Sequence, residues 1–182
     1  MPKVMLGSEE HPVRFSYANV WEAKASEGSD KLKYSVSILI DKKDKASLSR
    51  LKKAIEQAKE EGKASKWGGK VPKNLKGGLH DGDEDREDDE VYEGKMFINS
   101  SSKNRPGLLD RAKQPIIDED EFYSGCYGMV TVSIFPYEFN GNKGVTCLLN
   151  NILKLKDGEK LGGGASAESD FADFESEDEV LF

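Results

Sequence analysis

The sequence predicts a mainly β domain: a small, strongly bent antiparallel sheet closed into a barrel, with one amphipathic helix and long charged loops. Two observations support this fold class. Apolar and polar residues alternate with the period of a β-strand in several stretches, whereas helical spacing of apolar residues occurs in one stretch. A bent sheet with one helix between its strands suits this order of elements. An α+β sandwich is the competing architecture.

Five stretches have the pattern of β-strands, and they are residues 13–25 with a break near Asn19, 33–40, 94–101, 122–139 and 145–155. The fourth is the strongest, because Val130, Val132 and Ile134 share one face. The fifth is apolar on both faces, which predicts a central strand. Residues 140–144, Asn-Gly-Asn-Lys-Gly, have the chemistry of a hairpin turn, so we expect the last two strands to form a long hairpin.

The hydrophobic period changes after Asp44. Apolar residues then recur at helical spacing, at Leu48, Leu51, Ile55 and Ala58, with Lys and Glu between them. We expect an amphipathic helix of about 17 residues that is capped by Asp44 or Ser47 and stopped by Gly62.

Charge is concentrated in blocks along the chain. The net charge is −7, made of +7 for residues 1–80, −7 for 81–90, zero for 91–164 and −7 for 165–182. We therefore divide the chain into an N-terminal arm (1–12), one domain (13–161), and a Gly hinge with an acidic tail (162–182). The tail has seven acids and neither Lys nor Arg. Such a segment cannot bury enough apolar surface to fold alone, so we expect it to be disordered and to act as an interaction or self-masking element.

Several classes of protein and site are excluded by what the sequence lacks. No apolar run is long enough for a signal peptide or a membrane span. Cys126 and Cys147 lack the spacing of a disulfide framework or a zinc site, so we expect reduced thiols in the cytosol. The acidic block cannot be an EF-hand, because Arg86 and Tyr92 stand where Gly and Glu are required. No catalytic motif includes His11 or His80, so we expect neither an enzyme nor a metal or cofactor.

The segment 62–80 is the first candidate for binding a polyanion. It combines five glycines with Trp67 and a set of lysines without any acid: Lys63, Lys66, Lys70, Lys73 and Lys76. Single-stranded nucleic acid needs cations for its phosphates and flat rings for its exposed bases. The alternative is a solvated loop with Trp67 packed under the helix.

A second candidate is a row of aromatic residues on one face of the 122–139 strand: Phe135, Tyr137 and Phe139. Rings at this spacing can hold unpaired bases, or they can bury a small second core beneath the loops. Basic and aromatic residues repeat the pattern more weakly at Arg14 and Lys24 with Trp21, at Lys33 next to Tyr34, and at Lys103 with Arg105.

Several blocks resemble the single-stranded-DNA-binding proteins of tailed bacteriophages. They are residues 13–20 (VRFSYANV), 92–99 (YEGKMFIN), 103–110 (KNRPGLLD), 121–127 (EFYSGCY), 135–137 (FPY), 142–144 (NKG) and 149–151 (LNN). The resemblance implies an OB fold with an acidic C-terminal tail, although an ordinary OB barrel places its helix between strands three and four. The predicted helix here follows the second predicted strand.

The resemblance also implies a function, namely sequence-independent binding of single-stranded DNA in phage replication or recombination, in the cytoplasm of the infected bacterium. The expected partners are single-stranded DNA, phage or host replication and recombination proteins bound through the tail, and a second copy of the chain in a homodimer; no membrane is expected. The tail residues assigned to partner binding are Asp170, Asp173, Glu175, Glu177, Asp178, Glu179 and Phe182. The competing hypothesis is an acidic adaptor or chaperone-like protein that binds basic partners.

Overall fold

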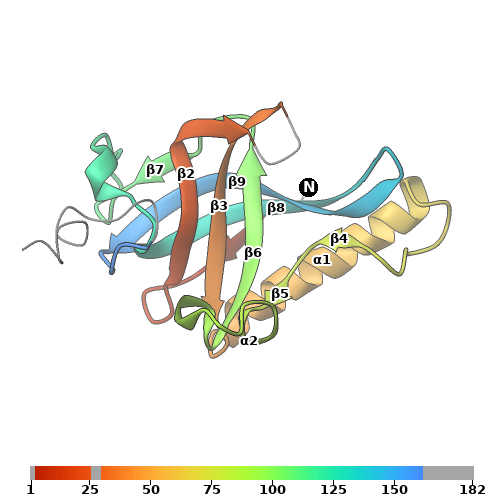
Figure 1. Ribbon diagram of the computed structural model, residues 1–182, viewed down its shortest axis with the longest axis horizontal. Coiled ribbons are helices and arrows are strands. Elements are labelled where there is room, and N and C mark those ends of the chain that lie inside the picture. The colour runs from red at the N-terminus through yellow and green to blue at the C-terminus, as the bar shows by residue number, and fades with distance from the viewer. Residues whose placement is uncertain (1–2, 26–29, 162–182) are drawn as a thin grey trace, which may run out of the picture.

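The structure, a computed structural model, describes residues 3–25 and 30–161 (Figure 1). The predictions for the acidic tail therefore lie outside the described residues. The elements in chain order are β1 (Lys3–Leu6), β2 (Val13–Ala25), β3 (Leu32–Asp41), α1 (Lys45–Ser65), β4 (Lys76–Gly77), β5 (His80–Asp81), α2 (Gly82–Asp85), a 3-10 turn (Glu90–Tyr92), β6 (Lys95–Ser102), β7 (Gly107–Leu109), a 3-10 turn (Glu119–Glu121), β8 (Tyr127–Phe139) and β9 (Asn142–Lys156).

The predicted fold class, mainly β with one long helix, is confirmed. Long antiparallel pairings join β2 to β3, β3 to β6, and β8 to β9. The two joints that would complete a ring are short: β6 meets β9 at Ser101 and Leu148, and β2 meets β8 at Val13 and Arg14. The OB-like sheet is thus strongly bent, but the barrel is not clearly closed.

The N-terminus differs from the polar arm expected for residues 1–12. Residues Lys3–Leu6 form β1, which pairs with β8, and Val4 and Leu6 are buried in the core. The Arg50 Nε atom donates a hydrogen bond to the carbonyl of Met5, which attaches the strand to α1. Four residues are too few to show a reliable period, so the pairing with β8 determines this strand.

The helix begins as predicted and ends later than predicted. An Asp44 carboxylate oxygen accepts a hydrogen bond of 3.1 Å from the Ser47 amide, which makes Asp44 the N-cap. Gly62 lies inside α1. A Cβ atom at Gly62 would stand 2.7 Å from the Trp67 ring and 2.8 Å from Pro136. This glycine permits a close approach between the helix and its neighbours, so it is a packing residue rather than a stop signal.

The predicted hairpin is confirmed. Asn140 and Gly141 connect β8 to β9, and both have positive φ, 50° and 81°. Two successive residues of this kind define the tight turn that matches the twist of paired strands.

One main core cluster fills the space between the bent sheet and α1. Cys126 and Cys147 are free and buried, and burial raises the pKa of their thiols to about 11 and about 12. A smaller cluster of Leu39, Tyr92 and Phe97 lies apart from the main core. None of the described helices is long and apolar enough to span a bilayer.

Candidate nucleic-acid interface

The outer face of β2, β3 and β6 carries two rows of short polar side chains. Residues directly opposite each other on antiparallel strands point to the same face of the sheet. The register therefore aligns Ser16, Ser37 and Asn99 in one row, and Asn19, Ser35 and Ser101 in the next. The result is a polar sheet face with hydrogen-bonding groups at regular intervals, on which Asn99 is exposed and Ser16 and Ser37 are buried.

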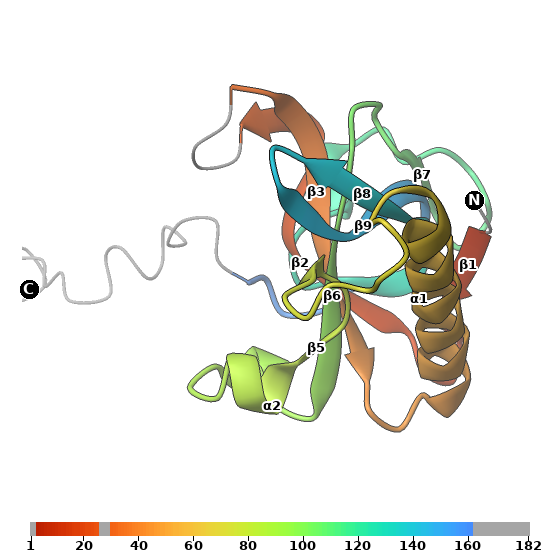
Figure 2. The ribbon, with the colours of Figure 1, turned by 90° about the vertical axis from the view of Figure 1, so that its right-hand side faces the viewer.

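Three adjoining cavities of about 440, 230 and 350 Å³ follow this face. Asn19 lines all three, so together they form one groove, lined among others by Tyr17, Asn19, Lys24, Lys33, Ser35, Ser37, Arg86, Asn99 and Ser101. Figure 2 shows the β2–β3 end and the α2 segment projecting to the same side of the molecule, with α1 on the opposite side. The groove thus has raised elements at both ends.

Tyr17 lies in the middle of the groove. Its side chain is 59% exposed. The β2–β3 register shifts between Ser16 and Asn19, and Tyr17 has a φ of 47°, which is uncommon for a non-glycine residue. The predicted break near Asn19 is therefore a local irregularity that turns an aromatic ring outward. Such irregular backbone is frequent at ligand sites.

Arg86 lies beside Tyr17 and was not predicted to belong to the site. Its guanidinium carbon is 5.9 Å from the centre of the Tyr17 ring and 5.3 Å from that of Tyr92, distances typical of cation–π contacts. It is the one basic residue among eight acids in residues 81–90. Its isolation among acids was the one feature of the sequence that marked Arg86 as unusual, but the sequence could not show which way the side chain points.

The acidic block is held against the sheet by Lys42. The Lys42 Nζ atom lies 2.8 Å from an Asp81 carboxylate oxygen and 2.6 Å from one of Asp83. Asp83 also accepts a hydrogen bond from the Gly94 amide. Hydrogen bonds from Lys42 lower the pKa of both carboxyl groups, and those carboxylates raise the pKa of Lys42. These contacts fix the loop that carries Arg86.

The other end of the groove is basic. Lys24 and Lys33 are directly opposite each other on β2 and β3, and both are exposed. Like charges in this arrangement are destabilising, so a nearby polyanion would relieve their repulsion. Four further predicted residues lie at this end of β2, β3 and β6: Trp21, Tyr34, Lys103 and Arg105. The Arg105 guanidinium carbon is 4.9 Å from the Trp21 ring centre.

Arg14 has a different position from the one expected for a DNA-binding residue. Its guanidinium donates hydrogen bonds to the carbonyls of Gly125 and Glu159 and packs over the Tyr127 ring at 5.2 Å. These contacts connect β2 to the segment after β9. The structure therefore gives Arg14 a role in holding the chain together, because its donors are used within the protein.

Trp67 is also not available for stacking on a base. The ring is 4% exposed, and its Nε1–H donates a 3.1 Å hydrogen bond to the carbonyl of Tyr137. The packed alternative for this residue is the one observed, because α1 and the β8–β9 hairpin enclose the ring. The surrounding lysines are exposed and do not line the groove, and they are Lys63, Lys66, Lys70, Lys73 and Lys76.

The three rings of the aromatic row on β8 differ in their exposure, so stacking on bases and burial beneath the loops each suit only part of the row. Phe135 and Tyr137 are half-buried, and the Tyr137 ring packs against Gly144. Phe139 is 62% exposed at the end of the hairpin, and the Lys31 Nζ atom lies 5.4 Å from its ring centre. The hairpin end therefore contacts the β2–β3 end, next to the basic end of the groove.

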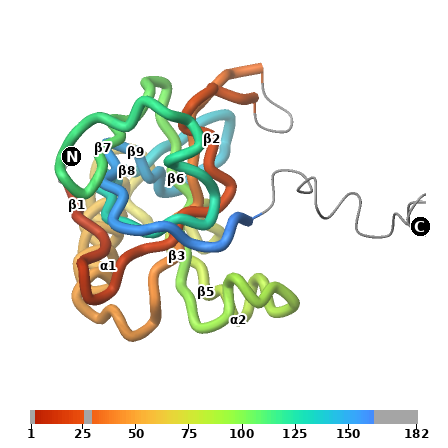
Figure 3. The backbone as a smooth tube through the Cα atoms, turned by 90° about the vertical axis from the view of Figure 1, so that its left-hand side faces the viewer, coloured from red at the N-terminus to blue at the C-terminus, as the bar shows by residue number. Residues whose placement is uncertain are grey.

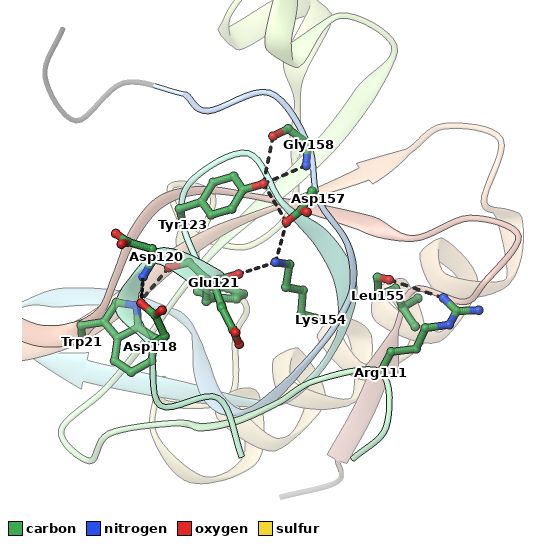
Figure 4. A network of polar contacts seen from close by, with 11 residues as sticks. Trp21, Arg111, Asp118, Asp120, Glu121, Tyr123, Lys154, Leu155, Asp157 and Gly158 are labelled. Atoms are coloured by element: carbon green, nitrogen blue, oxygen red, sulfur yellow. Dashed lines mark hydrogen bonds and ion pairs between the residues drawn. The ribbon is translucent and has the colours of Figure 1, made fainter. Parts of the chain in front are cut away.

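The segment after β9 returns to the groove. Asp157 accepts hydrogen bonds from the Tyr123 hydroxyl and Lys154, and the Tyr123 hydroxyl accepts one from the Gly158 amide (Figure 4). The ion pair lowers the pKa of Asp157. Figure 3 shows this segment, in blue, crossing one end of the molecule toward the side that carries α2. The last described residue, Leu161, donates its amide to the Ser124 carbonyl and lines the groove with Tyr17.

Proteins hold metal ions with groups of His, Cys, Asp and Glu side chains. Within residues 3–25 and 30–161, no three of them are grouped so as to hold an ion. The chemistry of the groove is that of hydrogen bonds, flat rings and cations.

Comparison with known proteins assigns the chain to a family. The profile of the family described as the ssDNA-binding protein of Enterobacter phage Enc34 matches residues 3–181. A relative named p50, from Acyrthosiphon pisum secondary endosymbiont phage 1, is 30% identical over 182 residues, which cover 93% of this chain and 95% of that protein.

Two solved structures share the fold. The single-stranded DNA-binding protein from bacteriophage Enc34 in complex with ssDNA has a TM-score of 0.73 and 25% identity, over 84% of this chain and 87% of that one. Bacteriophage T7 gp2.5, a single-stranded DNA binding protein, has a TM-score of 0.58 and 17% identity over 97% and 96% of the two chains, which shows the fold alone. The chain therefore belongs to the family of the Enterobacter phage Enc34 ssDNA-binding protein.

Proposed function

We propose that this protein binds single-stranded DNA in the groove, largely independently of sequence, during phage DNA replication or recombination in the host cytoplasm. The observation that carries the proposal is the combination of the exposed Tyr17 ring with the Lys24–Lys33 pair on one polar sheet face. Single-strand sites combine rings that stack on bases with cations that follow the backbone. An enzymatic role is not proposed, because the family is described by its binding to ssDNA.

The path of the strand follows from the positions of these groups. OB folds bind oligonucleotides on one sheet face and between two loops. Here the corresponding elements are the β2–β3–β6 face, the β2–β3 end and the β8–β9 hairpin, which approach each other through Lys31 and Phe139. Phosphates would lie along Lys24, Lys33, Lys103 and Arg105, and bases would face Tyr17.

The test is a titration of labelled oligo-dT with the full-length protein, followed by fluorescence anisotropy and gel mobility. We expect tight binding at low salt. If five phosphates are contacted, a slope near −0.7 per contact gives about a hundredfold weaker binding at 200 mM than at 50 mM salt. No binding at low salt would refute the proposal.

The acidic tail is proposed to compete with DNA and to recruit partner proteins through its acids and Phe182. The position of Leu161 at the groove supports this, because the acidic segment begins four residues later. Deleting residues 165–182 should tighten binding of oligo-dT, because it removes an acidic competitor for the same cations. Unchanged or weaker binding after the deletion would contradict masking. A homodimer remains a prediction, which sedimentation of the full chain would test.

A further inference from the structure

The groove contains a small cavity of about 230 Å³. Its lining has more hydrogen-bonding side chains than contact with a DNA backbone alone requires. Tyr17 and Arg86 line it together with polar residues of the sheet, among them Asn19, Ser35, Ser37 and Asn99. We propose that this cavity is a recognition pocket for one unpaired nucleobase, which it reads by hydrogen bonds to the base edge. The inference rests on the proposed function and adds a base preference at one position of the bound strand.

Two buried polar atoms near the pocket have no partner. Ser37 is 4% exposed and Tyr92 is 1% exposed, yet neither the Ser37 Oγ atom nor the Tyr92 hydroxyl is hydrogen-bonded within the described part of the chain. Ser37 lines the pocket, and Tyr92 packs against Arg86 and lines the adjoining cavity. Buried polar groups are normally paired, so an unpaired hydroxyl on the wall of a cavity indicates a ligand that supplies the missing partner.

The hydrogen-bonding groups of the pocket match the edge of a base. The carboxamide of Asn99 is exposed and offers both a donor and an acceptor, and the Ser37 hydroxyl can do the same. The Asn19 Nδ2 atom donates to the Ser35 hydroxyl and to the carbonyl of Tyr17, each at 3.3 Å, which holds its amide in place. Base edges carry mixed donors and acceptors, whereas a phosphate carries acceptors alone. Arg86 is the single cation of the lining.

Flat groups are available against which a base can stack. Tyr17 presents an exposed ring, and Arg86 presents a planar guanidinium beside it. Unstacked bases in protein complexes are held in this way on aromatic rings and arginine planes, and are then read along their edges. Arg86 sits on a loop that Lys42 anchors to the sheet, so the pocket wall is already in position before a strand binds.

The experiment compares oligo-dT, oligo-dC and oligo-dA of equal length as competitors for the full-length protein. A good set of hydrogen bonds to a base should separate the tightest from the weakest homopolymer by about fivefold or more. Asn99→Ala and Ser37→Ala should each reduce that spread to about twofold or less. Ser49→Ala is the control, because Ser49 is an exposed serine of α1 that does not line the groove. It should leave the spread unchanged. Thermal unfolding of each variant verifies that it is folded.

The outcomes separate the inference from the function on which it rests. Equal, tight binding of all three homopolymers overturns the pocket and leaves single-strand binding intact. A spread that survives both pocket substitutions also overturns it, since the preference would then come from stacking or backbone flexibility. Failure to bind any homopolymer refutes the proposed function itself. Because Asn99 is exposed, its substitution tests the pocket even if Ser37→Ala does not fold.

Discussion

The groove and the lysine-rich segment 62–80 differ in where they place their charged side chains and aromatic rings. The segment has five lysines and a tryptophan close together in sequence, but the ring is buried and the lysines do not line the groove. The groove has few charges, but strand register brings its ring, its cations and its polar side chains to one face. Side chains that converge from several strands therefore define this site better than the density of basic residues along the chain does.

The largest expected effect is on stability, in the lysine-rich segment. Trp67→Ala should lower the free energy of unfolding by about 3–5 kcal/mol, because it removes a buried ring between α1 and the hairpin. Urea denaturation measures the loss. The affinity of the folded fraction for oligo-dT should stay within about twofold, since the ring makes no contact in the groove. Weaker DNA binding at unchanged stability would show that Trp67 is a stacking residue after all.

In the groove, we expect a substitution to lower the affinity for DNA without lowering the free energy of unfolding. Tyr17→Ala should weaken binding of oligo-dT by about 1–3 kcal/mol, the value of one base stacked on an aromatic ring. The free energy of unfolding should hardly change, because the side chain is mostly exposed. Tyr17→Phe keeps the ring and is the matched control, so it should bind almost as tightly as the unaltered protein. Equal losses from both substitutions would assign the effect to the hydroxyl instead of the ring.

The lysines of the groove and those of segment 62–80 should differ in their effect on the salt dependence of DNA binding. Lys24→Ala combined with Lys33→Ala should reduce the dependence of log affinity on log salt by about 1.4, or 0.7 for each lost phosphate contact. The matched pair, Lys63→Ala with Lys66→Ala, removes the same charge outside the groove and should leave the slope unchanged. Anisotropy titrations at four salt concentrations provide both slopes. A larger change from the second pair would return the binding site to the lysine-rich segment.

The smallest effect concerns the loop that carries Arg86. Asp81 and Asp83 have pKa values lowered by Lys42, so their contribution to stability is present above the ordinary pKa of 3.8 and is lost as pH falls through their lower folded values. Amide hydrogen exchange in residues 81–93 should therefore speed up below about pH 4, relative to the intrinsic rate, while β8 and β9 stay protected. Lys42→Ala should produce the same local opening at neutral pH. Protection that is insensitive to both changes would show that the loop is held by other contacts.

Local patterns were sufficient for much of the fold. The strands at 13–25, 33–40 and 122–139, the cap at Asp44 and the Asn140-Gly141 turn were all predicted, because each depends on neighbouring residues. The end of the helix was predicted wrongly. Gly62 has the composition of a stop signal, but a distant contact with Trp67 and Pro136 explains it.

The candidate site was predicted only in part. Lys33 lines the groove. Trp21, Tyr34, Lys103 and Arg105 lie at the same end of β2, β3 and β6 but do not line it, and the Trp21 Nε1 atom donates a hydrogen bond to the carbonyl of Phe122. Arg14 and Trp67 have the same composition, but their polar groups bond within the protein. Asn99 and Ser37 have no local signal of their own, and the isolation of Arg86 among acids does not show where its side chain points. All three become a site through neighbours distant in the chain.

By itself, the sequence determined the class of fold, the hairpin, the start of the helix and the division of charge, because periodicity and turn chemistry act over a few residues. Tertiary structure alone decided that β1 joins β8, that Trp67 is buried, and that the shift in register turns Tyr17 outward toward Arg86. These outcomes depend on pairing and packing between residues distant in the chain. A one-residue shift in strand register moves a side chain to the other face of a sheet, so no local pattern could specify the groove.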